Sequence, residues 1–327
     1  MHGQPLNPFL MRFLIVFFSC LLALDSPAQQ SAYPYPQKSI RLSIEQMPVR
    51  MAYMDVLPAA QANGRTVVLL HGKNFNGYYW KEVIAYLSGA GYRVVVPDQV
   101  GWGYSDKPNI HYSFHLLAAN TKALLDSLGV GRVLLVGHSM GGMLATRFAL
   151  QYPQLVERLV LENPIGLEDY RTFIPYRSPD EQVEQELAAT VESLRQYQRS
   201  YYPEWKPEYE PYVTAQWEAL QYPEFPTAAW ASALTYNMII EQPVVYELGN
   251  LRMPVLLIIG QEDRTVVGKG LLSPSEKNRH GNYPELGRMV HAKIKGSKLV
   301  PLAGVGHIPH IQAPDAFRKA LLDFLPQ

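Results

Sequence analysis

Residues 134–153 of the chain read LLVGHSMGGMLATRFALQYP and place a serine, with one residue on either side, between two glycines. On a sharp turn from a strand to a helix, such a serine holds its hydroxyl above the carboxyl edge of a sheet, and the glycines let neighbouring backbone pass close by. A glycine-rich turn with a helix-capping serine is the alternative interpretation. Because the pattern follows an apolar run and precedes an amphipathic helix, we interpret Ser139 as a candidate nucleophile.

The rest of the chain alternates between strand and helix patterns. Continuous runs of β-branched residues and leucine are typical of strands buried on both faces of a parallel sheet. Helical patterns at residues 79–90, 114–128, 140–151 and 314–325 lie between or after these runs. The alternation predicts an α/β fold with a mostly parallel central sheet and helices on both faces. The expected strands span residues 40–45, 49–55, 66–70, 93–97, 133–136, 159–161, 255–260 and 297–302.

One long segment interrupts this alternation. Residues 165–250 contain no convincing buried strand, and they hold ten of the 21 tyrosines of the chain. A helix is expected to begin near residue 178, where Ser178 can cap it, Pro179 suits its first position and Glu181 completes a capping box. We interpret the segment as a helical lid inserted after the sixth strand, with a core made of residues 39–164 and 251–327.

A nucleophilic serine needs two partners. Its hydroxyl is a weak nucleophile unless a base accepts the proton, and the base needs an acid that holds and stabilises its ring. After this kind of turn the acid and then the histidine are expected downstream. Asp263 directly follows the expected strand 255–260, and His307 follows the expected strand 297–302. Both therefore come at the carboxyl edge, where the sites of open α/β sheets gather.

Five ordered motifs support this interpretation. They are LLHGKN at residues 69–74, PDQVGWGYSDKP at 97–108, VGHSMGG at 136–142, GQEDRTV at 260–266 and GVGHIPH at 304–310. Through them the chain resembles the α/β-hydrolase superfamily over residues 40–325, in the branch that has a serine nucleophile and a lid. The resemblance implies that Ser139 is the nucleophile, His307 the base and Asp263 its acid partner.

Alternatives exist for the base and the acid. His310 lies three residues beyond His307, although the histidine of the superfamily follows the glycine pair as His307 does. Glu162 directly follows the expected strand 159–161, at a position where some members of the superfamily place the acid. His71 and His138 are interpreted as packed residues, one shaping its own loop and the other beside the serine turn.

The negative oxygen of a tetrahedral intermediate needs preorganised N–H donors, worth about 3 kcal/mol each. The resemblance implies the backbone amides of Met140 and Lys73 for this role. The side chain of Lys73 either points to solvent or reaches the pocket and binds an acidic substrate. Asn74, Trp102 and His138 are the candidates for the substrate pocket, although Asn74 could instead form a turn.

Composition limits the partners of the chain. Its 29 Lys and Arg residues balance its 29 Asp and Glu residues, and no long run of one sign occurs. Affinity for nucleic acid therefore has no compositional support. No phosphate-binding loop, dinucleotide fingerprint or zinc helix is present, and the glycines of residues 98–106 suit a tight loop better than a cation site. We expect a small-molecule substrate, no metal and no cofactor.

The first residues have the pattern of an export signal. Residues 12–28, RFLIVFFSCLLALDSPA, combine a positive charge, an apolar run and small residues before a cleavage site after Ala28. The apolar run is too short for a membrane-spanning helix, which needs about 20 residues. A buried helix and an uncleaved anchor are the alternatives, and Met11 is an alternative start. We expect a signal peptide at 1–28, a linker at 29–38 and a periplasmic or secreted protein without stable membrane insertion.

The predicted function is hydrolysis of a small or medium carboxylic ester, or a related acyl compound, through an acyl-enzyme. Members that hydrolyse epoxides use an aspartate at the nucleophile position, so Ser139 disfavours that chemistry. A carbon–carbon bond hydrolase of diketones would use the same triad, and the fold also serves as a ligand receptor. Some aromatic lid residues are expected to wall the pocket, with candidates Tyr201, Tyr202, Trp205, Trp217 and Trp230.

Overall fold

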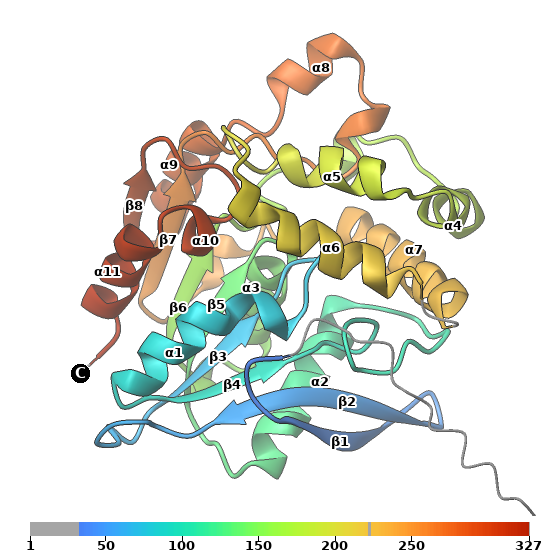
Figure 1. Cartoon of the computed structure of the whole chain (residues 1–327). Coiled ribbons are helices and arrows are strands. Elements are labelled where there is room, and N and C mark those ends of the chain that lie inside the picture. Colours follow the sequence, from blue (N-terminus) through green and yellow to red (C-terminus); the bar gives the residue numbers. More distant parts are fainter. Residues whose placement is uncertain (1–32, 222–223, 327) are drawn as a thin grey trace, which may run out of the picture.

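One mixed sheet organises the molecule (Figure 1). The computed structural model describes residues 33–221 and 224–326, so the expected signal peptide lies outside the described residues and stays a prediction. The strands follow the order β1-β2-β4-β3-β5-β6-β7-β8, with β1 and β2 antiparallel to their neighbours and the others parallel. This sheet confirms the predicted fold class. The strands are β1 (Gln37–Ile44), β2 (Met47–Val56), β3 (Thr66–Leu70), β4 (Arg93–Pro97), β5 (Val133–His138), β6 (Val156–Glu162), β7 (Val255–Gly260) and β8 (Lys298–Leu302).

Helices cover both faces of the sheet and divide the core in two. Alternate residues of a strand point to opposite faces. Val67 and Leu69 belong to the part of the core that includes side chains of α1 and α11, whereas Val68 and Leu70 belong to the part that includes side chains of α2, α3 and α9. All four side chains are fully buried, which stabilises the fold by about 1.5–3 kcal/mol for each of them. These helices are α1 (Lys81–Gly89), α2 (Phe114–Ser127), α3 (Met140–Gln151), α9 (Tyr283–Lys293) and α11 (Pro314–Phe324).

A helical segment lies over the carboxyl edge of the sheet (Figure 1). It follows β6 and begins with the capping box that the sequence predicts, since Ser178 and Glu181 each accept a hydrogen bond from the backbone N–H of the other. In this segment α4 packs on α7, and α5 packs on α6. Its helices are α4 (Pro179–Leu187), α5 (Val191–Arg199), α6 (Glu210–Ala219) and α7 (Phe225–Glu241). We call this segment the lid.

Several elements differ from the sequence prediction. Strand β1 begins at Gln37, inside the expected linker, because β2 is long enough to pair with it as far as Met54. Helices α8 (Pro274–Arg279) and α9 come between β7 and β8, where no helix was predicted. The start of α8 carries the same Ser-Pro-x-Glu capping box as α4, at Ser273 to Glu276. That motif could have located the helix. A short helix, α10 (Pro309–Gln312), precedes α11.

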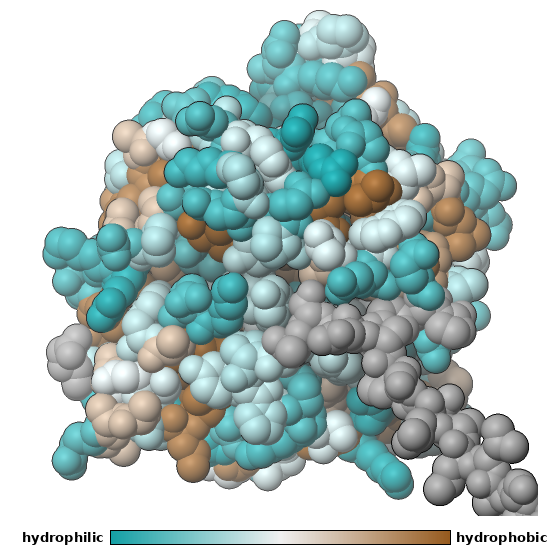
Figure 2. All heavy atoms as spheres, in the orientation of Figure 1, coloured by the Kyte–Doolittle hydropathy of each residue, from teal (hydrophilic) through white to brown (hydrophobic). Residues whose placement is uncertain are grey.

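The surface shows few apolar groups on the face drawn in Figure 2. Most coloured side chains there are hydrophilic, and apolar side chains form small separate groups. Within the described residues, no helix combines the length and the apolar character needed to cross a bilayer.

Three backbone segments approach each other closely at the turn after β5. A Cβ atom added at Gly141 would lie 2.1 Å from the carbonyl oxygen of Leu70, and one added at Gly137 would lie 2.2 Å from the carbonyl oxygen of Gly141. Both distances are far below van der Waals contact, and backbone atoms cannot turn away as a flexible side chain can. The turn therefore requires glycine at both positions.

We predict that Gly141→Ala lowers the free energy of unfolding by about 1–3 kcal/mol, because β3 or α3 must shift to make room. Urea unfolding followed by circular dichroism measures the change. Gly131→Ala is the matched control, since a Cβ atom at Gly131 would have no heavy atom within 4 Å. Equal unfolding midpoints for the two variants would contradict the packing argument.

Candidate active site

Four neighbouring parallel strands each bring one polar side chain to the edge below the lid. Ser139 directly follows β5 and Asn163 directly follows β6, whereas Asp263 and His307 lie in the loops after β7 and β8. The four strands are consecutive in the sheet. Because their carboxyl ends meet at one edge, residues that are far apart in the sequence become neighbours.

The predicted triad residues form a hydrogen-bonded series. The distance from His307 Nε2 to Ser139 Oγ is 3.0 Å, and that from His307 Nδ1 to Asp263 Oδ2 is 2.7 Å. A carboxylate only accepts, so the imidazole donates through Nδ1–H and its Nε2 is free to accept the serine proton. His307 and Asp263 are fully buried, and Ser139 is 7% exposed. The sequence predicted this grouping, and the catalytic roles stay a prediction.

The backbone of Ser139 is strained. Its φ of 56° and ψ of −121° belong to a conformation that side-chain-bearing residues rarely adopt, at a cost of about 1–3 kcal/mol. Neighbouring backbone holds it there: the N–H of Ser139 donates to the carbonyl of Glu162, and its own carbonyl accepts from Gly142 and Ile165. The strain raises the hydroxyl above the start of α3.

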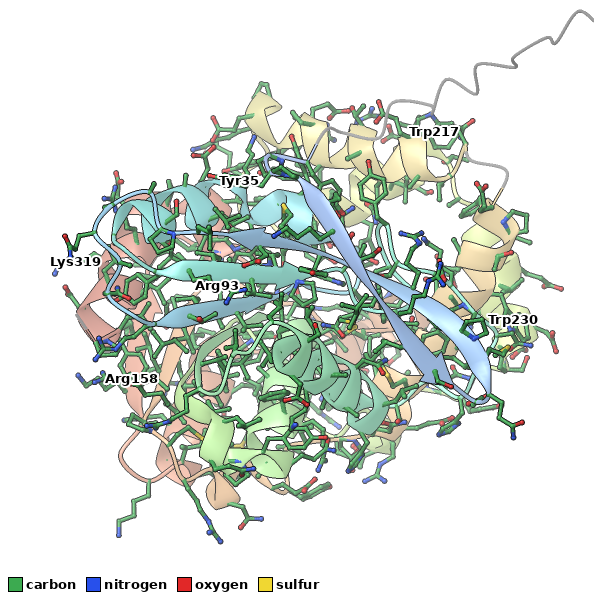
Figure 3. The ribbon with its side chains drawn as sticks, turned by 90° about the horizontal axis from the view of Figure 1, so that it is seen from below. Tyr35, Arg93, Arg158, Trp217, Trp230 and Lys319 are labelled. Carbon is green, nitrogen blue, oxygen red and sulfur yellow. The ribbon has the colours of Figure 1, made fainter. Side chains whose placement is uncertain are left out.

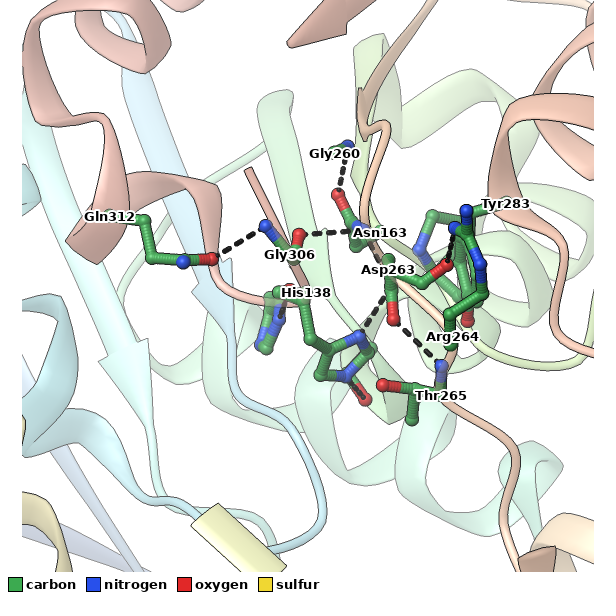
Figure 4. Close-up of polar contacts among 12 residues, drawn as sticks. His138, Asn163, Gly260, Asp263, Arg264, Thr265, Tyr283, Gly306 and Gln312 are labelled. Carbon is green, nitrogen blue, oxygen red and sulfur yellow. Dashed lines mark hydrogen bonds and ion pairs between the residues drawn. The ribbon is translucent and has the colours of Figure 1, made fainter. Parts of the chain in front are cut away.

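Asn163 orients the acid, and the sequence analysis missed it. Its Nδ2 donates to Asp263 Oδ2 at 2.6 Å and to the carbonyl of Gly306, while its Oδ1 accepts from the N–H of Gly260 (Figure 4). Burial alone would raise the pKa of the Asp263 carboxyl. The His307 ring and the hydrogen bonds from His307, Asn163 and Thr265 outweigh burial and hold that pKa below its ordinary value.

The loop after β3 passes directly over the serine. A Cβ atom added at Gly72 would lie 3.2 Å from the Cβ of Ser139. Within the described residues the backbone amide of Lys73 has no hydrogen-bond acceptor, and the amide of Met140 lies at the first position of α3. Met140 directly follows the serine and Lys73 directly follows Gly72, and the oxyanion role of the two amides stays a prediction.

The side chain of Lys73 reaches the lid. It is only 13% exposed, donates to Ser232 Oγ of α7 at 2.7 Å and lies 3.7 Å from Glu186 Oε1 of α4. Its carbonyl accepts a hydrogen bond of 2.6 Å from Trp102 Nε1. The solvent-facing alternative for Lys73 is therefore wrong, since its ammonium group connects the loop to two lid helices.

A cavity of about 530 Å³ lies between the lid and the loops that follow β3 and β4. Lys73, Asn74 and Trp102 line it, whereas Ser139 and His307 are not among its lining residues, so the substrate-binding roles of Asn74 and Trp102 stay predictions. None of the five aromatic lid candidates lines it, whereas Phe225 and Tyr212 of the lid do. Trp217 and Trp230 lie at the outer edge of the lid (Figure 3).

His138 is not a pocket residue, which corrects the prediction. Its side chain is fully buried and belongs to a polar chain behind the serine. The N–H of Gly72 donates to the hydroxyl of Tyr79, the hydroxyl lies 3.0 Å from His138 Nδ1, and His138 Nε2 lies 2.8 Å from the carbonyl of His307. A carbonyl only accepts, so Nε2 carries the proton and Nδ1 accepts from Tyr79. Burial keeps the ring neutral by holding its pKa well below the ordinary value.

The two alternative triad residues contact each other. Glu162 accepts hydrogen bonds from the backbone N–H of His310 at 2.7 Å and from its Nδ1 at 2.8 Å, and both side chains are buried. The hydroxyl of Ser139 bonds to His307 and to neither of these two side chains. His71 likewise shapes its own loop, because its Nε2 accepts from the N–H of Gln99 while its Nδ1 donates to the carbonyl of Gly72.

We predict that Asn163→Gly destabilises the protein in a pH-dependent way. Glycine tolerates the left-handed φ of 35° at this position, so the variant mainly loses the amide bonds. Because the folded pKa of Asp263 is lowered, its carboxylate contributes stability above the unfolded pKa of about 3.9, and this stability is lost as the pH falls through the folded pKa.

The difference in free energy of unfolding between wild type and Asn163→Gly should therefore be largest near neutral pH and shrink in acid. Urea titrations at several pH values measure it. A difference that stays constant down to the acid limit of the native state would show that Asn163 does not act through the Asp263 carboxylate.

Comparison with known proteins agrees with this fold. A model of the α/β-hydrolase fold family matches residues 65–314. A crystal structure of a probable hydrolytic enzyme from Pseudomonas aeruginosa PAO1 is 48% identical, with a TM-score of 0.88, and the match covers 90% of this chain and 96% of that one.

Two curated relatives match over shorter segments. An uncharacterized protein of Mycobacterium tuberculosis is 42% identical over 105 residues, which is 32% of this chain and 30% of that protein. The 2-hydroxy-6-oxo-2,4-heptadienoate hydrolase of Pseudomonas putida is 40% identical over 108 residues, which is 32% of this chain and 39% of that protein. The chain thus spans only 30–39% of the length of these two relatives. The family model covers most of the chain, and the chain belongs to the α/β-hydrolase fold family.

Proposed function

We propose that this hydrolase cleaves a small or medium carboxylic ester, or a related acyl compound, through an acyl-enzyme on Ser139. The observation that carries the proposal is the hydrogen-bonded series from Ser139 through His307 to Asp263. Membership of the family supports hydrolysis in general. The preference for an ester is inferred from the serine nucleophile, which suits attack on a carbonyl carbon.

In the proposed mechanism, Ser139 Oγ attacks the carbonyl carbon while His307 Nε2 accepts its proton, and Asp263 stabilises the imidazolium that forms. The amides of Met140 and Lys73 donate to the negative oxygen of the tetrahedral intermediate. His307 then gives its proton to the leaving alcohol, which departs and leaves an acyl-serine. A water molecule, deprotonated by the same Nε2, attacks the acyl carbon; the bond to Ser139 Oγ then breaks, His307 returns the proton to that oxygen, and the acid is released. The mechanism needs no metal and no cofactor.

A second candidate is hydrolysis of a carbon–carbon bond beside a carbonyl. The relative from Pseudomonas putida is named a 2-hydroxy-6-oxo-2,4-heptadienoate hydrolase, and its match to this chain favours the candidate. The same three residues could support that reaction. The leaving group would then be a carbon that must be protonated, instead of an alcohol oxygen. A ligand receptor that turns over slowly is the remaining alternative.

We predict that the purified chain hydrolyses p-nitrophenyl esters from acetate to decanoate and that Ser139→Ala lowers kcat by about three decades or more, because the nucleophile is lost. Ser275→Ala is the matched control, since Ser275 is exposed on α8 and should leave the rate unchanged. The dependence of kcat/KM on acyl length measures the size of the pocket. If Ser139→Ala hydrolysed these esters as fast as wild type, the esterase proposal would be overturned.

Two further assays separate the alternatives. A fluorophosphonate probe should label wild type and not Ser139→Ala, whereas a receptor without an activated serine should not react. Vinylogous diketones offered beside the esters separate the two reactions, because a carbon–carbon hydrolase should prefer them in kcat/KM. Labelling without ester turnover, together with diketone cleavage, would replace the first candidate by the second.

We also propose that residues 1–28 are an export signal and that the mature protein is periplasmic or secreted. The composition of residues 12–28 supports this proposal. Removal of residues 1–28 should leave the unfolding midpoint and the ester rate unchanged, and fractionation of expressing cells should place the full chain outside the cytoplasm. Loss of folding on truncation would contradict the proposal.

A further inference from the structure

One lid residue contacts the histidine of the triad in two ways. Tyr201 lies between α5 and α6, and its backbone carbonyl accepts a hydrogen bond of 2.8 Å from the N–H of His307. Its ring stacks on the imidazole of His307, with ring centroids 4.8 Å apart and planes inclined by 26°. Tyr201 is 6% exposed, so the lid holds this ring in a buried position against the proposed base.

The same residue also contacts the loop that carries the predicted oxyanion donor. The hydroxyl of Tyr201 accepts a hydrogen bond of 2.9 Å from Asn74 Nδ2, and Asn74 directly follows Lys73. Burial raises the pKa of Tyr201 well above its ordinary value, so the hydroxyl stays neutral. One side chain of the lid therefore touches both the histidine loop and the loop after β3.

The backbone of Gly306 and His307 is held by four hydrogen bonds to four different parts of the chain. Gly306 donates to the Gln312 side chain and accepts from Asn163, and the His307 carbonyl accepts from His138. The fourth bond, from the N–H of His307, goes to the lid. A Cβ atom added at Gly306 would lie only 2.2 Å from the carbonyl oxygen of Tyr201, so the lid backbone rests directly on this loop.

We propose that Tyr201 is a positioning residue, which orients the His307 ring by stacking and holds the loop at Asn74 through its hydroxyl. The inference rests on the proposed function, in which both loops act in catalysis. Because the proposed role of Tyr201 is exerted through His307 and Asn74, its loss should lower kcat and leave KM nearly unchanged. Tyr201 would affect kcat because it aligns His307 and the loop at Asn74, which act on the reacting atoms in the proposed mechanism.

A purely structural role predicts a different result. Tyr201 belongs to a small apolar cluster with Tyr202, Tyr209 and Ile308. If it only filled that cluster, its replacement would lower the unfolding midpoint without changing kcat in the protein that stays folded. Activity and stability must therefore be measured on the same variants.

The test compares Tyr201→Phe, which removes the hydroxyl, with Tyr201→Leu, which also removes the aromatic ring. We expect kcat to fall about three- to tenfold in the first, the effect of one hydrogen bond, and further in the second. KM should change less than about twofold in both. Tyr202→Phe is the matched control, because the buried hydroxyl of the adjacent Tyr202 has no hydrogen-bond partner among the described residues. Wild-type kcat in both Tyr201 variants would overturn the proposal.

A double variant tests the link between the two loops. If the hydroxyl of Tyr201 acts through Asn74, then Tyr201→Phe combined with Asn74→Ala should lower kcat no further than the larger of the two single changes. Additive effects would show that Tyr201 and Asn74 act independently, which would overturn the part of the proposal that concerns the loop after β3.

A spectroscopic measurement keeps the proposal separate from the proposed function. Stacking on a tyrosine ring shifts the NMR signals of the His307 ring protons, which are assigned by comparison with His307→Gln. Tyr201→Phe should keep the shift and Tyr201→Leu should lose it, whether or not an ester is cleaved. If no ester is cleaved by wild type, the proposed function fails while these spectra still decide the position of Tyr201. Unchanged His307 signals in Tyr201→Leu would overturn the inference.

Discussion

The close approach of backbone at the turn after β5 is the constraint on which the site depends. Without side chains at Gly137 and Gly141, the start of α3 can lie against the end of β3, where the carbonyl of Leu70 leaves no room for a Cβ atom. At this turn Ser139 has a positive φ, and its hydroxyl bonds to His307. The turn also leaves the amide of Met140 at the start of a helix, where the helix dipole favours negative charge.

The order of the sheet then brings the partners of the serine to it. Ser139 and His307 are 168 residues apart, yet β5 and β8 are separated only by β6 and β7. Each intervening strand is followed by a residue that supports the pair, Asn163 after β6 and Asp263 in the loop after β7. The hydrogen-bonded series therefore runs from Ser139 after β5 to His307 after β8, and returns through Asp263 to Asn163. Burial of the whole series strengthens each of its hydrogen bonds, because water does not compete for them.

Local pattern decided what could be predicted from the sequence. Ser139, Asp263 and His307 each follow a buried apolar run with a recognisable turn, so their positions and their grouping could be inferred, as could the sheet and the lid. Tyr79 and Tyr201 could not, because their contacts arise only when distant segments pack together, and nothing in the sequence distinguishes Tyr201 from the other lid tyrosines. Asn163 lies just after the predicted strand 159–161, at the edge where sites of such sheets gather, so its position could have been inferred. His138 was misplaced because its position beside the serine does not reveal which way its ring points.

Among the described residues, the lid contacts the loop after β3 at Lys73 and both this loop and the histidine loop at Tyr201, and these two contacts differ in strength. At one, Lys73 lies 3.7 Å from Glu186, and both side chains keep some contact with water, so this ion pair contributes little. The hydrogen bond to Ser232 adds to it. At the other, the buried carbonyl, ring and hydroxyl of Tyr201 all have partners in the core. Separation at Tyr201 would leave the N–H of His307 without its acceptor, which is costly for a buried group. The lid is therefore held more firmly beside the histidine than at α4, and the histidine loop depends on the lid for one of its four backbone hydrogen bonds.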